Sequence, residues 1–64
     1  MKTMNHAEYQ RRLKNKSILE LEYILQDANE TLKANPYGEN AGFYADEIHY
    51  AAAELRRRIQ ANNS

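Results

Sequence analysis

Residues 17–34 read SILELEYILQDANETLKA and are followed at 35–40 by NPYGEN. Ser17 and Glu20 have the spacing of a capping box, in which each side chain accepts a hydrogen bond from the other residue's backbone N–H. Apolar residues then recur at intervals of three and four, at Ile18, Leu21, Leu25, Ala28 and Leu32. This spacing predicts a helix over 18–34 with one apolar stripe, which Leu19 and Ile24 widen and Tyr23 borders.

The turn at 35–40 separates this helix from a second one. Pro36 cannot donate a backbone hydrogen bond and disfavours helical geometry at Asn35. The spacing of three and four returns at Ala45, Ile48, Ala52, Leu55 and Ile59, which predicts a helix over about 41–60. Residues 61–64 should fray.

A shorter helix is expected over about 6–14. Asn5 and Glu8 form another possible capping box, and Met4, Ala7, Tyr9 and Leu13 give a weak amphipathic pattern. No segment shows the alternation of a β-strand. The sequence therefore predicts one small all-α domain over 1–64, in which a short N-terminal helix precedes an antiparallel helical hairpin.

Length and composition exclude several classes of protein. The chain has 64 residues, nine basic and nine acidic, and no cysteine, which excludes disulfides and a thiolate zinc site. A chain this short has a marginal core, so well-packed helices or self-association are expected to support it. No segment is a transmembrane candidate, and the start MKTMNHAEYQRR lacks the apolar run of a signal peptide. We therefore expect a cytoplasmic protein with no membrane partner.

The charges are unevenly distributed along the chain. Residues 1–16 hold five basic residues and one acidic residue, residues 17–54 hold eight acidic residues and Lys33, and the last ten hold three arginines. Such blocks favour contact between the basic ends and the acidic middle, in an antiparallel or head-to-tail arrangement. The basic ends could also meet phosphate, or simply form solvated helix faces.

The helix over 41–60 carries a second row of residues, Phe43, Glu47, Tyr50 and Glu54. The two aromatic residues have no obvious partner within the hairpin. One interpretation is that the row is an interaction surface for a second copy, giving a helical bundle. The alternative is that the helix over 6–14 covers it.

Catalytic and metal-binding motifs are lacking in the sequence. Asp46 and His49 have the spacing of the carboxylate–histidine pairs of helical metal sites, but they border the apolar stripe, whereas such a site needs ligands that point inward. No glycine-rich phosphate loop or nucleophile motif occurs. We therefore expect no catalytic residue, no metal and no cofactor.

A small anionic ligand and nucleic acid are further candidate partners. Tyrosine rings can stack on a base while guanidinium groups bind phosphate. The candidate contacts are Tyr9, Arg11, Arg12, Tyr44, Arg56, Arg57 and Arg58, with Tyr50 as another stacking ring. Nucleic acid is the less favoured partner, because the chain has no net charge and no helix-turn-helix spacing.

Residues 41–58, AGFYADEIHYAAAELRRR, resemble a group of very small proteins encoded by tailed bacteriophages and prophages. His6-Ala7-Glu8-Tyr9 and Arg11-Arg12-Leu13 are also similar to that group. The resemblance implies a context rather than an activity: an accessory phage product that acts in the bacterial cytoplasm. Such products are often inhibitors or adaptors that bind a host protein, and some sequester signalling nucleotides.

These observations together favour a non-enzymatic, self-associating protein that binds a partner macromolecule, such as a host protein that it inhibits or modulates. The first alternative is a nucleotide-binding sponge that sequesters a signalling nucleotide. The second alternative is a nucleic-acid-binding protein.

Overall fold

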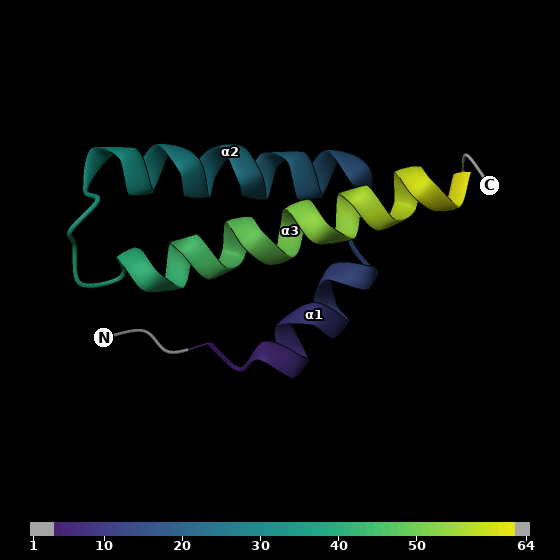
Figure 1. The fold of residues 1–64 in the computed structure, drawn as a ribbon, viewed down its shortest axis with the longest axis horizontal. Coiled ribbons are helices and arrows are strands. Elements are labelled where there is room, and N and C mark those ends of the chain that lie inside the picture. Colours follow the sequence, from purple (N-terminus) through teal and green to yellow (C-terminus); the bar gives the residue numbers. More distant parts are fainter. Residues whose placement is uncertain (1–3, 63–64) are drawn as a thin grey trace.

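A computed structural model describes residues 4–62, which form three helices and no strand. Helix α1 spans His6–Lys14, α2 spans Ile18–Ala34 and α3 spans Ala41–Asn62. The chain reverses direction between α2 and α3, which lie side by side, and α1 packs mainly on α3 (Figure 1). The expected all-α class is therefore confirmed for the part of the chain that the structure describes.

Local signals set the ends of the helices. The Ser17 Oγ accepts a hydrogen bond of 3.1 Å from the Glu20 N–H, and the Ser17 N–H donates one of 2.8 Å to Glu20 Oε1, so the capping box is present. Asn5 caps α1 by accepting from the Glu8 N–H at 3.2 Å. α2 ends at Ala34, two residues before Pro36, as the backbone of proline requires.

The end of α3 differs from the expectation. Ala61 and Asn62, which were expected to fray, continue the helix. Asn63 and Ser64 lie outside the described residues.

The fully buried apolar core is small. Leu13 from α1, Leu21 from α2 and Ala51 from α3 form one cluster, so each helix contributes to it. Ala28 is buried separately on α2. Five partly buried residues pack against the cluster: Tyr9, Ile24, Leu25, Tyr50 and Leu55.

The stripe expected on α2 is only partly buried. Leu21 and Ala28 are buried and Leu25 is half-buried, but Ile18 is 46% exposed and Leu19 is 77% exposed. The expectation that Leu19 widens the packing face is wrong. The reason is geometric: α2 packs only along one side, and a residue two positions before Leu21 points about 160° away from it.

The stripe expected on α3 is rotated in the structure. Ala45 and Ile59 are exposed, whereas Ala51 and Glu54 are buried. α3 packs on two helices rather than one, so its buried face is centred between them. The buried position of Glu54 on that face brings a charged group into the junction with α1.

Candidate functional site

Glu54 lies at the centre of a charged cluster between α1 and α3. Its side chain is 9% exposed, and its carboxylate accepts hydrogen bonds from Arg57 Nη2 at 2.6 Å and from Arg58 Nε at 2.8 Å. Hydrogen bonds from Arg57 and then from Arg58 lower the pKa of Glu54 to about 2, against the opposing effect of burial. The carboxylate is therefore ionised and fully engaged, which suits it to structure rather than to proton transfer.

Arg58 joins this cluster to the end of α1. Its Nη2 donates to the backbone carbonyl oxygens of Leu13 and Lys14, at 3.1 Å each. The last carbonyls of a helix have no partner within the helix, and a cation is favourable at that end of the helix dipole. Arg58 thus binds α1 and Glu54 at once.

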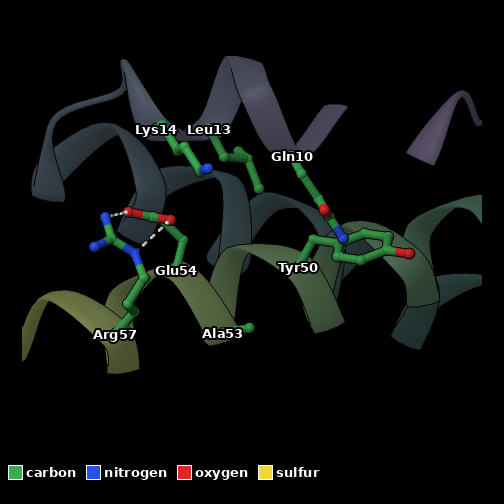
Figure 2. A pocket seen from close by; sticks show the side chains of 7 residues that line it. All are labelled: Gln10, Leu13, Lys14, Tyr50, Ala53, Glu54 and Arg57. Carbon is green, nitrogen blue, oxygen red and sulfur yellow. Dashed lines mark hydrogen bonds and ion pairs between the residues drawn. The ribbon is translucent and has the colours of Figure 1, made fainter. Parts of the chain in front are cut away.

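A small pocket lies beside the Glu54 cluster. Its walls come from α1 and α3, with Gln10, Leu13 and Lys14 on one side and Tyr50, Ala53, Glu54 and Arg57 on the other (Figure 2). The pocket holds about 150 Å³, which is below the range of about 300–1,000 Å³ typical of small-molecule sites. We therefore give it no role in ligand binding.

The row Phe43, Glu47, Tyr50 and Glu54 has intrachain partners, contrary to the expectation. The Tyr9 hydroxyl donates a hydrogen bond of 2.9 Å to Glu47 Oε2. The Tyr50 hydroxyl and His6 Nδ1 share one of 2.9 Å, and the two rings lie 5.5 Å apart. At Glu47 and Tyr50, the alternative interpretation, that the first helix covers this row, describes the structure.

Aromatic rings surround Tyr50 in the same junction. Tyr9 lies 6.3 Å and His49 lies 5.2 Å from it between ring centroids. Burial, followed by the hydrogen bond to Glu47, raises the pKa of the Tyr9 hydroxyl well above its usual value of 10. The hydroxyl therefore stays protonated and serves as a hydrogen-bond donor between α1 and α3.

Five of the seven candidate anion contacts have partners on the protein. Arg12 pairs with Glu8 at 2.8 Å, Tyr9 donates to Glu47, and Arg57 and Arg58 hold Glu54. Tyr44 stacks edge-on with Phe43 at 5.7 Å. Arg11 and Arg56 are exposed on α1 and α3.

These seven residues do not converge on one site within a single chain. Tyr44 and Arg58 are separated by about 21 Å along α3, at about 1.5 Å of rise per residue. Tyr50 and Arg57 do line the same small pocket, although the carboxylate of Glu54 holds the guanidinium of Arg57 there (Figure 2).

Side chains of Asp46 and His49 do not form part of a larger ligand set. No group of three or more metal-binding side chains occurs within residues 4–62. His49 is exposed and packs its ring edge-on against Tyr50.

The surface that the sequence interpretation missed is on α2. We call the exposed residues Ile18, Leu19 and Tyr23 the apolar surface. Leu19 is 77% and Tyr23 is 70% exposed, and both lie on the side of α2 that points away from the buried Leu21. Ile59 on α3 is also exposed, at 58%.

A groove runs along part of the apolar surface. It holds about 360 Å³ and is lined by Lys16, Leu19, Glu20, Tyr23 and Ile24. The signal for it was present in the sequence, since six of the eight residues at 18–25 are apolar and point to all sides of the helix.

Comparisons with protein-family models, with curated proteins and with solved structures find no match for this chain. Within residues 4–62, no helix combines the length and the apolarity needed to cross a membrane.

Proposed function

We propose that this chain is a non-enzymatic interaction protein that acts by binding another protein through its apolar surface. One observation carries the proposal. Only two large apolar side chains, Leu13 and Leu21, are fully buried in the described part of the chain, whereas five large hydrophobic residues are exposed there. Three of those five, Ile18, Leu19 and Tyr23, lie within two turns of α2 and form the apolar surface, and clustered exposure of this kind marks protein interaction sites.

The polar residues of α2 indicate what kind of partner the surface fits. Glu20, Glu22, Asp27 and Glu30 are all exposed, and Lys33 is the only basic residue of the helix. An apolar surface with an acidic margin is complementary to an apolar segment flanked by basic residues. The resemblance to small phage proteins adds a context, in which the partner is a bacterial protein that the chain inhibits or modulates in the cytoplasm.

The two alternative functions have less support. A nucleotide sponge needs tyrosine rings and arginines directed at one ligand, but most of the candidate contacts bind other side chains of the protein. Nucleic-acid binding would have to overcome the acidic exposed side of α2. We expect neither nucleotides nor DNA to raise the melting temperature, whereas a ligand that binds the folded chain raises it further as the ligand concentration increases.

Site-specific photo-crosslinking in bacterial cells tests the proposal. A photoreactive residue replaces Leu19 or Tyr23 in one set of variants and the exposed Lys33 or His49 in the control set. We expect crosslinks to a discrete heterologous protein from positions 19 and 23, and none from positions 33 and 49. Excess unlabelled protein should compete for the crosslink, and a Leu19→Ser competitor should not.

The proposal is wrong if all four positions crosslink to the same extent. It is also wrong if excess unlabelled protein does not reduce the intensity of the crosslinked band. Melting curves with cyclic and linear nucleotides are recorded in parallel. A melting temperature that rises with nucleotide concentration would favour the nucleotide-binding sponge.

A further inference from the structure

The groove on α2 has features that suit one particular occupant. Leu19 and Tyr23 lie one helical turn apart on the side of α2 that points away from the buried Leu21. Asp27 follows one turn later and is exposed. At the other end, Lys16 lines the groove. The surface therefore runs from a basic end, across two large apolar side chains, to an acidic end.

We propose that a second copy of this chain fills the groove, with the two α2 helices packed antiparallel so that Leu19 of each subunit lies on Tyr23 of the other. The inference rests on the proposed function, because it takes the apolar surface to be a binding surface, which the second copy covers until the partner protein displaces it.

The register follows from the positions of these residues. A two-fold axis at the level of Leu21 puts position 19 of one helix opposite position 23 of the other, since both are two residues from the centre. Lys16 is five residues before the centre and Asp27 is six residues after it. The two charges of opposite subunits then lie at nearly the same height, and a two-fold axis makes this pairing twice.

Charge favours this antiparallel arrangement over a parallel one. In a parallel pair, Lys16 would face Lys16 and Asp27 would face Asp27, which is unfavourable for both ends. In the antiparallel pair each basic end meets an acidic end. Glu20 and Glu22 lie near the centre and oppose the pairing, but the carboxylate of Glu20 is directed to its own helix terminus by the Ser17 N–H at 2.8 Å.

A second copy also supplies what the single chain lacks. Apolar side chains within residues 18–25 point to several sides of α2, yet α3 and α1 cover only the side that carries Leu21 and Ile24. Packing two copies covers the remaining side of both helices. Small domains without disulfides commonly gain stability through such association.

Sedimentation velocity at several protein concentrations tests the inference. We expect a dimer for the unaltered chain. Leu19→Ser and Tyr23→Ser should raise the dimer Kd by more than about 100-fold, because each removes a large side chain from two symmetric contacts. Both residues are exposed in the subunit, so circular dichroism should show unchanged helix content.

Charge reversal tests the register. Lys16→Asp and Asp27→Lys should each raise the dimer Kd by about tenfold, and the double variant should restore it. Lys33→Asp is the matched control, since it makes the same change of charge on α2 outside the proposed pairing, and it should leave the Kd unchanged.

Cysteine pairing gives a second measurement of the register. The chain has no native cysteine. Mixing Leu19→Cys protein with Tyr23→Cys protein should give chiefly the mixed disulfide, because facing positions on packed helices satisfy disulfide geometry. Preferential 19–19 and 23–23 disulfides would overturn the antiparallel register.

Two outcomes separate this inference from the proposed function. If the chain remains monomeric at millimolar concentration yet crosslinks to another protein from position 19, the inference that a second copy fills the groove is wrong. The proposed function is then supported. A dimer that is weakened by Lys16→Asp and by Asp27→Lys and restored by the double variant, but that crosslinks to no other protein, supports pairing with a second copy. It overturns the proposed function.

Discussion

Arg58→Gln should destabilise the fold by about 2–3 kcal/mol. Arg58 is 20% exposed in its side chain and donates to the carboxylate of Glu54 at 2.8 Å. A hydrogen bond to a charged group contributes about 1.5–3 kcal/mol. The same guanidinium also holds the carbonyl oxygens of Leu13 and Lys14, and cations at a helix C-terminus contribute about 0.3–1 kcal/mol. These contributions share one group, so they add incompletely.

Arg57→Gln is the matched control for this prediction. Arg57 binds the same carboxylate at a shorter distance, 2.6 Å, but its side chain is 59% exposed and its hydrogen bonds within residues 4–62 go to Glu54 rather than to a carbonyl of α1. Water competes for an exposed ion pair, so the loss should be much smaller. The two variants therefore show whether the free energy of unfolding depends on burial and on the contact with α1, which favour Arg58, or on the shorter hydrogen bond, which favours Arg57.

Urea denaturation followed by circular dichroism at 222 nm measures both variants, at one protein concentration because association would shift the midpoint. For a domain of this size, about 1 kcal/mol shifts the melting temperature by roughly 4–8 °C. Equal losses for Arg57→Gln and Arg58→Gln would refute the reasoning, since exposure and the link to α1 would then not decide the energy.

Three further predictions follow from the packing and the charges. Leu21→Ala should cost about 2–5 kcal/mol in the same denaturation assay, because it leaves a cavity at a fully buried site. The folded-state pKa of Glu54 is about 2, below its ordinary value of 4.5, so its stabilising effect is complete above pH 4.5 and is lost as the pH falls from there towards 2. When the Glu54→Gln variant is titrated with acid, its free energy of unfolding should not show this loss between pH 4.5 and 2. A pH profile identical to that of the unaltered chain would contradict the stabilising role given to Glu54. Gly42→Ala should raise the free energy of unfolding by about 0.5–1 kcal/mol, because an added Cβ at this helical position meets nothing within 4 Å, and a lower melting temperature would contradict this.

The positions of the helices could be predicted from the sequence because their signals are local. Ser17 and Glu20 form their capping box within one turn, and Pro36 acts on its neighbour. Such contacts depend on spacing alone. They do not depend on how the helices pack.

The placement of α1 could not be predicted in the same way. It depends on pairs such as Tyr9 with Glu47 and Arg58 with Leu13, which are 38 and 45 residues apart. Nothing in the spacing of either residue identifies the other. The pairing of Glu54 with Arg57 and Arg58 is different, because these residues are three and four apart on one helix and their spacing alone predicts the contact.

The apolar surface was overlooked for a different reason. The residues at 18–25 were assigned to a single packing stripe, although a stripe on one side of a helix cannot include both Leu19 and Leu21. The angular positions of the apolar residues around α2 contain this information. Only the packing shows which of those positions remain exposed.

The docking of α1 on α3 also has a consequence for the order in which the structure forms and opens. The turn at 35–40 brings α2 and α3 together over short sequence separations, whereas α1 meets α3 through residues about 40 apart, and closing the longer loop costs more entropy. We expect α2 and α3 to associate first and α1 to dock last. In the native state, amide hydrogens of α1 should exchange through a partial opening that leaves the other two helices protected.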